Sequence, residues 1–183
     1  MLKTSTLQLP GDPEPITLTE LPALVADRRA RAVLAAIEAP MDAGVVGLAL
    51  EHLPRVLANA ERAVELLEPF VVASRPVRRW AHVLSVQQAA LALHVGFLVG
   101  RPRVEVPVRM QAENIRRSGE DVAVQFCSPT LATVLHSKRA SYVELETVLS
   151  TEDAYNLAEL VNVEAIAEWH AYQNAAHTTG NPR

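Results

Sequence analysis

The sequence predicts a mainly α-helical protein, a helical bundle with a short β-hairpin at its N-terminus. Three observations lead to this fold class. Apolar residues make up 49% of the 183 residues but aromatic residues only 4%, so the apolar content is mostly Ala, Leu and Val, which favours helices packed through small side chains. Apolar positions recur every three or four residues through most of the chain. Residues that typically begin and end helices stand at the boundaries of these periodic segments.

The first 40 residues predict the hairpin and the first helix. Thr4–Leu9 alternates polar residues with Leu, and Ile16–Leu18 can pair back onto it as a second strand. Between them, Pro10–Pro15 holds three prolines and a glycine, which excludes a helix and favours a turn. Apolar residues then recur at helical spacing as far as Glu38, and Ala39-Pro40 ends this helix.

Three further helices are predicted before residue 100. Asp42–Leu53 begins with a capping Asp, and Pro54 separates it from the next helix. Arg55–Leu67 has apolar residues on one stripe and charged residues opposite. Ser74–Val99 begins with Ser-Arg-Pro and is followed by Gly100, and both are typical helix boundaries. Its apolar part is shorter than the roughly 20 residues that span a bilayer, so we expect no membrane association.

Residues 101–128 are predicted to form either a linker or a small second β element over Val104–Phe126. Arg103–Arg109 alternates charged and apolar residues, which is the period of a strand, and Pro107 would confine such a strand to an edge. Asp121–Phe126 is the candidate for the second strand of this element.

Helical patterning returns after Pro129. Ser141 is the expected cap of a helix over Tyr142–Leu149, and Ser150 stands at the start of a long last helix with acidic residues in its first turn. This last helix either runs unbroken or breaks near Asn162. The elements divide the chain into three predicted regions: a hairpin with helices over residues 1–100, the central segment 101–128, and an acidic helical region over residues 129–183.

Charge divides the chain into three blocks of alternating sign. Met1–Ser74 has 6 basic and 10 acidic residues, Arg75–Gly119 has 8 arginines and 2 acids, and Glu120–Arg183 has 3 basic and 9 acidic residues. Blocks of opposite sign can attract one another within the chain or between copies, so we expect self-association. The formal net charge of −4 argues against a dedicated nucleic-acid-binding protein, whose affinity depends on a cationic surface.

The sequence predicts no catalytic, cofactor or metal site. Its glycines are scattered and form no phosphate-binding loop. His170 and His177 share a helical face, but a third metal ligand is missing. His94 lies among Leu and Val and is expected to be a core histidine that is hydrogen-bonded to the backbone. Cys127 is the only cysteine, and we expect a small buried hydrophobic residue rather than a nucleophile.

Four segments resemble the lambda-type tail assembly chaperones of long-tailed phages, the G protein and its frameshifted G-T extension. Met1–Leu7 is similar to the opening strand of that family, and Ile16–Leu24 to its "T-L-[ST]-E-L" helix start. Glu65–Ala73 is similar to the aromatic-valine-valine segment that ends a helix there. Leu149–Leu160 resembles the short acidic helical C-termini of chaperones that are encoded beside tape-measure genes.

This resemblance implies a non-catalytic chaperone in the host cytoplasm, without cofactors. In that family the G-like portion, here residues 1–100, binds the long helical tape measure protein. The T-like extension, here residues 129–183, recruits the tail-tube protein. The chaperone then leaves and is absent from the virion. The arginine-rich middle block departs from the family pattern, which places the junction of the two portions in question.

The partner would then be gripped by apolar residues on the helices Leu21–Ile37 and Val56–Leu67. Helical spacing selects four candidates, for each of which the alternative is an ordinary core position: Leu24, Leu34, Leu57 and Val64. Two other functions stay open. One is a virion structural or adaptor protein, and the other is a small regulator that contacts nucleic acid through the arginines of the middle block.

Overall fold

The computed structural model describes residues 1–36, 68–77, 79, 82–102, 104–110 and 126–179. Most of these residues are helical, and the strands among them form an N-terminal hairpin, so the predicted fold class is confirmed. The elements are, in order, β1 (Thr4–Leu7), β2 (Ile16–Thr19), α1 (Ala23–Ala36), the 3-10 turn η2 (Glu68–Phe70), α4 (Val83–Val95), the 3-10 turn η4 (Gly96–Leu98), α6 (Pro129–His136), α7 (Tyr142–Thr147) and α8 (Thr151–Thr179).

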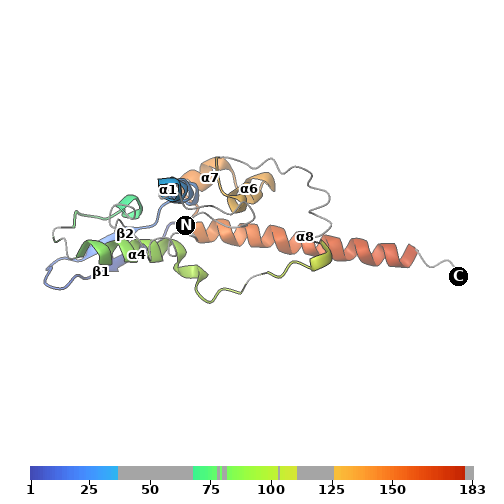
Figure 1. Cartoon of the computed structure of the whole chain (residues 1–183), viewed down its shortest axis with the longest axis horizontal. Coiled ribbons are helices and arrows are strands. Elements are labelled where there is room, and N and C mark those ends of the chain that lie inside the picture. Colours follow the sequence, from blue (N-terminus) through green and yellow to red (C-terminus); the bar gives the residue numbers. More distant parts are fainter. Residues whose placement is uncertain (37–67, 78, 80–81, 103, 111–125, 180–183) are drawn as a thin grey trace.

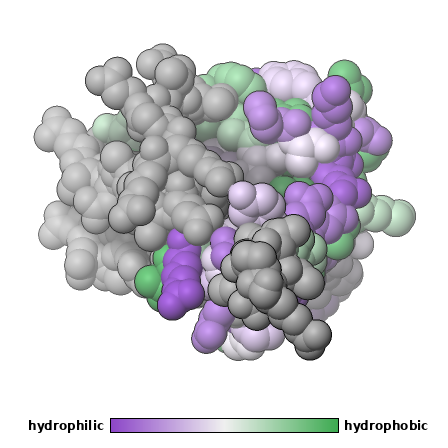
Figure 2. Space-filling model, turned by 90° about the vertical axis from the view of Figure 1, so that its right-hand side faces the viewer, coloured by the Kyte–Doolittle hydropathy of each residue, from purple (hydrophilic) through white to green (hydrophobic). Residues whose placement is uncertain are grey.

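The labelled elements lie around the N-terminal end of α8 and beyond it (Figure 1). The hairpin and α4 lie at one end of the molecule, and α1, α6 and α7 lie together above the start of α8. The second half of α8 extends past these labelled elements toward the C-terminus. Figure 2 looks at the end to which α8 runs, where the coloured surface mixes hydrophilic and hydrophobic residues rather than presenting one hydrophobic face.

The hairpin is antiparallel and is widened by a third extended segment. Thr4 lies opposite Thr19, and Leu7 opposite Ile16. Leu18 of β2 also forms an antiparallel bridge with Ala73 on its other side. The N–H of Thr19 donates to the carbonyl of Val72, and the N–H of Ser74 donates to the carbonyl of Thr17, both at 2.9 Å.

This pairing corrects one predicted helix boundary. Ser74 does not begin a helix, because its N–H is bonded to β2 and its hydroxyl accepts the N–H of Thr17 at 3.1 Å. The helix starts at Val83 instead. The two helices predicted over 42–53 and 55–67 lie outside the described residues.

One core joins the beginning and the end of the chain. Leu24 and Leu34 of α1 pack in the same buried cluster as Leu131 of α6 and Leu145 of α7. Ala154 and Ala158 of α8 complete the cluster with small side chains that allow close helix packing. This cluster therefore contains residues of both predicted regions, 1–100 and 129–183, whereas a second buried cluster, of Leu9, Ile16, Leu18, Val86 and Ala90, lies within the first region.

His94 is a buried residue that connects α4 to this core, against which Leu91 and Val95 of the same helix also pack. The N–H of Leu21 donates to its Nε2 at 2.9 Å, and its Nδ1 is 2.6 Å from the carbonyl of Ala90. These partners assign the proton to Nδ1, so the ring is neutral. Burial lowers the pKa of His94 below its ordinary 6.5, and Phe70 packs edge-on to the ring at 5.9 Å. The structure confirms the predicted core histidine.

A buried carboxylate joins α1 to α6. Oδ2 of Asp27 accepts the N–H of Ser128 at 3.0 Å, and Ser128 is the residue that precedes α6. Nε of Arg31 lies 3.5 Å from the same oxygen. Cys127 is buried beside this pair, and desolvation followed by the charge of Asp27 raises the pKa of its thiol to about 11. A thiol that stays protonated at neutral pH fits the predicted buried residue and not a nucleophile.

The two predicted serine caps are present. Ser141 and Glu144 form a capping box, in which the N–H of Glu144 donates to the Ser141 hydroxyl and the N–H of Ser141 donates to the Glu144 carboxylate. The hydrogen bonds from Ser141 lower the pKa of Glu144. Ser150 and Asp153 exchange the same two bonds at the start of α8, each at 3.0 Å. α8 is continuous through Asn162, so the helix runs unbroken.

The predicted small β element is wrong over its first half. Val104–Pro107 is not a strand, and Val108–Met110 is helical. Pro107 has no N–H to give to a ladder, and no strand lies beside this segment in the described part of the chain, so alternation alone was not enough to form one. Asp121–Gln125 lies outside the described residues, and Phe126, which follows, is in a bend.

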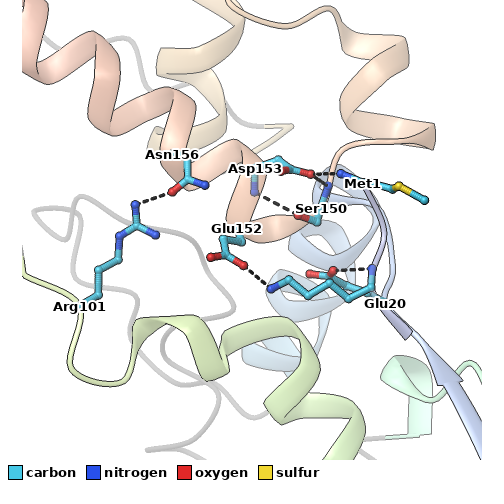
Figure 3. A network of polar contacts seen from close by, with 8 residues as sticks. Met1, Glu20, Arg101, Ser150, Glu152, Asp153 and Asn156 are labelled. Atoms are coloured by element: carbon cyan, nitrogen blue, oxygen red, sulfur yellow. Dashed lines mark hydrogen bonds and ion pairs between the residues drawn. The ribbon is translucent and has the colours of Figure 1, made fainter. Parts of the chain in front are cut away.

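A polar network holds the N-terminal segment against the start of α8 (Figure 3). The N–H of Lys3 donates to the buried carboxylate of Glu20 at 3.1 Å, and the Lys3 ammonium pairs with Glu152. The Met1 amino group contacts Asp153. Burial raises the pKa of Glu20. The acidic first turn of α8 is thus balanced by positive charge from the segment that leads into β1.

The neutral state of His94 predicts a loss of stability in acid. The unfolded chain binds a proton on this residue near its ordinary pKa of 6.5, whereas the lowered pKa keeps it neutral in the folded chain. Unfolding therefore takes up a proton, and the free energy of unfolding should fall as the pH drops below 6.5, by up to about 1.4 kcal/mol per pH unit. Glu20, whose pKa is raised above 4.5, works in the opposite direction at lower pH.

Urea unfolding between about pH 8 and about pH 5 checks this. We expect His94→Gln to be less stable at pH 8 and to show a flatter dependence on pH than the wild type. His170→Gln, which changes an exposed histidine on α8, should keep the wild-type dependence. Equal pH dependence in the wild type and in His94→Gln would contradict the assignment.

The Asp27 carboxylate predicts a second stability effect. Asp27→Ala leaves the Ser128 N–H without its acceptor in a buried site, which should reduce the free energy of unfolding by about 1–3 kcal/mol. Asp27→Asn keeps an oxygen acceptor and should recover part of that loss. Chemical denaturation measures both variants, with Glu168→Ala on the exposed surface of α8 as the control. An Asp27→Ala variant as stable as this control would show that the bond contributes nothing.

Candidate partner-binding groove

An open groove of about 750 Å³ lies between the segment that follows η2 and the first turns of α4. Its apolar walls are formed by Val71, Ala73, Val77, Val83 and Val86. Its polar lining residues are Glu68, Ser74, Arg75 and Gln87. A groove with branched aliphatic walls and a few polar groups suits an apolar segment that is held without deep burial.

Both walls of the groove rest on the N-terminal hairpin. Ala73 is fixed by its bridge to Leu18. On the other wall, Val86 and Ala90 of α4 pack in one buried cluster with Ile16 and Leu18 of β2. The separation between the walls is therefore set by the hairpin, which both elements contact. Such a groove is formed before a partner arrives.

Arg75 lines the groove but is engaged by the hairpin turn. Its Nη2 lies 2.9 Å from Oδ1 of Asp12, and its Nε lies 3.9 Å from the carboxylate of Glu14. Only 16% of the side chain is exposed. Arg75 thus fixes the turn between β1 and β2 relative to the groove, and its charge is balanced within the chain.

Arg101, a second arginine of the basic block, is also used internally. It donates to Asn156 on α8 (Figure 3). It also pairs with Glu159 on the same helix. Its guanidinium lies 5.0 Å from the ring of Tyr155 and 5.7 Å from the ring of Phe97. Both arginines therefore attach segments of the chain to one another, and neither presents an isolated cation of the kind that binds nucleic acid through phosphate.

The structure accounts for two of the four residues predicted to face a partner. Leu24 is 0% exposed and Leu34 is 2% exposed, so the folded chain does not offer them to a partner. Both are therefore ordinary core residues, which was the alternative interpretation of these two positions. Leu57 and Val64 lie outside the described residues. The prediction of a partner-facing role for Leu24 and Leu34 is corrected accordingly, and the groove provides the candidate residues instead.

Local sequence patterns did not predict the groove, because Ser74–Val99 has the pattern of one long helix. One signal could have found it. Pro69 and Pro76 bracket a run of two valines and an alanine, and this spacing leaves no room for a helix but allows a short extended segment. That the segment pairs with Leu18 depends on residues some 55 positions away, which no local pattern encodes.

The described residues also bear on two other features, a metal site and a membrane-spanning helix. Within them, no group of three or more His, Cys, Asp or Glu side chains could hold a metal ion. No helix in that part of the chain is long and apolar enough to cross a membrane.

In comparisons with protein-family models, with curated proteins and with solved structures, no significant match to this chain was found.

Proposed function

We propose that the protein is a non-catalytic tail assembly chaperone of long-tailed phages, which acts in the host cytoplasm and binds the tape measure protein through the groove beside α4. The acidic helical region over residues 129–183 would help to recruit tail-tube subunits. The observation that carries this proposal is the meeting of segments that resemble the chaperone family. Leu18 lies in the segment Ile16–Leu24, and its bridge partner Ala73 lies in the segment Glu65–Ala73.

The pairing of these two residues is informative because the segments are far apart in the sequence. Thr4–Leu7, Ile16–Thr19 and the extended residues at Val72–Ser74 form one small antiparallel unit. The same unit supports both walls of the groove. A resemblance shared by separate segments that assemble at one site supports a common role for them.

The chemistry of the groove fits a helical apolar partner. An amphipathic helix can place side chains at i, i+3, i+4 and i+7 against aliphatic walls such as Val77 and Val83. Both valines are half-buried, so the contact would gain apolar burial without needing the protein to open. Polar groups at Glu68 and Ser74 keep part of the lining hydrated, which suits a contact that must later be released.

Charged substitutions in the groove test this proposal. Val77→Asp and Val83→Asp place a carboxylate on the apolar walls and should weaken binding of a purified tape-measure fragment at least tenfold, as measured by calorimetry. Val143→Asp on α7, at a valine that is 66% exposed, is the matched control and should bind like the wild type. Melting temperatures identify any variant that fails to fold. If the wild type does not bind the fragment, the function is wrong; if the groove variants bind as well as the control, only the site is wrong.

Particle composition separates a chaperone from a virion adaptor. We expect the protein to be present in infected cells and absent from purified virions by mass spectrometry, because its contacts are released when the tail tube polymerises. Recovery in virions at a fixed ratio to the tube protein would favour the adaptor.

A further inference from the structure

His94 contacts both elements that carry the walls of the groove. It belongs to α4, whose first turns form one wall through Val83 and Val86. Its ring packs edge-on against Phe70 of η2, with 5.9 Å between the ring centroids, and Phe70 directly precedes Val71 of the other wall. Both ring residues are 0% exposed. The imidazole is therefore a buried contact between the two elements on either side of the groove.

The imidazole also attaches α4 to a third element, the start of α1. Its Nε2 accepts the N–H of Leu21 at 2.9 Å, and its Nδ1 donates to the carbonyl of Ala90, one turn earlier in α4, at 2.6 Å. Because one ring nitrogen accepts and the other donates, only the neutral ring satisfies both contacts. A second proton would sit on Nε2 and face the N–H of Leu21, so that a donor meets a donor. The buried N–H of Leu21 would then lose its acceptor.

The charged groups around His94 do not compensate a protonated ring. Burial lowers the pKa of His94, and the positive charges of Arg29 on α1 and of Lys3 lower it further. Within the described residues, no carboxylate forms an ion pair with the ring. Of the carboxylates on the elements around it, three are bound by Lys3 or by the Met1 amino group and one is exposed: Glu20, Glu152, Asp153 and Glu68. Protonation therefore breaks the contact with Leu21 without forming an ion pair in its place.

We propose that His94 is an acid-sensitive switch of the groove: the neutral ring holds the two walls at the separation seen in the structure, and a second proton releases them. Phe70 is joined to the wall that follows it, because the N–H of Val71 donates to the carbonyl of Glu68 at 3.0 Å. A shift of Phe70 is therefore carried into Val71. On the other side, α4 stays attached to the hairpin through Val86. One wall thus moves relative to the other while the hairpin remains folded.

This switch regulates the groove named in the proposed function, and it rests on that proposal only for the identity of the partner. A partner that fits the walls of the neutral form binds the protonated form more weakly. By linkage, a bound partner also disfavours protonation of His94. Because burial keeps the pKa of His94 below its ordinary 6.5, affinity is full at neutral pH and should fall as the pH decreases below that value.

Distances between spin labels test the switch without a partner. Labels at Val72→Cys and Leu84→Cys, which are 38% and 46% exposed, report the separation of the two walls in a Cys127→Ser background. NMR of the imidazole protons gives the pH at which His94 is protonated, and circular dichroism gives the range in which the protein stays folded. The distance should change as His94 titrates in the folded protein. An unchanged distance across this titration, or unfolding before His94 takes up a proton, would overturn the proposal.

Histidine variants identify the group responsible. His94→Gln keeps an oxygen that can accept the N–H of Leu21 without titrating, so its label distance should not depend on pH. His82→Gln is the matched control, because His82 directly precedes Val83 of the groove wall. The dissociation constant for the tape-measure fragment should rise about tenfold or more between about pH 8 and about pH 5.5 in the wild type and in His82→Gln, but stay nearly constant in His94→Gln. The reverse pattern would overturn the assignment to His94. A fragment that binds at neither pH contradicts the proposed function, and the spin labels then still decide the switch.

Discussion

The packing of this protein depends on how the backbone N–H groups at the start of α1, and just before it, are satisfied. A helix leaves its first N–H groups without partners inside the helix. Here the N–H of Leu21 donates to the ring of His94 in α4, and the N–H of Ala23 donates at 2.9 Å to the carbonyl of Leu149, just before α8. Pro22, between them, has no N–H to satisfy. Three elements from distant parts of the sequence therefore meet at one helix end. This contact requires a neutral His94, because a protonated ring could not accept the hydrogen bond from the N–H of Leu21.

As a result, one buried cluster contains residues from both ends of the chain, and small side chains make many of its contacts. Its helices pack through alanines as well as leucines, so the buried face of α8 needs only small residues such as Ala154 and Ala158. Aliphatic side chains elsewhere are left in contact with solvent. One group of them lines the groove between the segment that follows η2 and the first turns of α4, and others are exposed singly, among them Val143 on α7 and Leu160 on α8. Polar and ionic contacts, such as Arg75 with the hairpin turn and Arg101 with α8, fix segments of the chain relative to one another.

Local signals in the sequence were sufficient for some features and insufficient for others. The capping serines at 141 and 150 and the burial of His94 were predictable, because a cap acts within four residues and an imidazole in an apolar run has few alternatives. The extended segment at Ala73 and the bond from Ser128 to Asp27 were not, since both join residues more than 50 positions apart. Leu24 shows a further limit: helical periodicity marks an apolar face but does not tell whether the chain itself or a partner covers it.

The depth of the groove bears on the function proposed for this protein. Val77 and Val83 are half-buried in the folded chain, so an apolar helix bound there would gain only part of the burial that a core residue gains. If several copies bound one long helical protein in this way, each contact would be individually weak. A polymerising tube would then need to displace only one weak contact at a time. A shallow groove whose walls are fixed before binding is therefore consistent with the proposal that the protein holds a long apolar partner and later releases it.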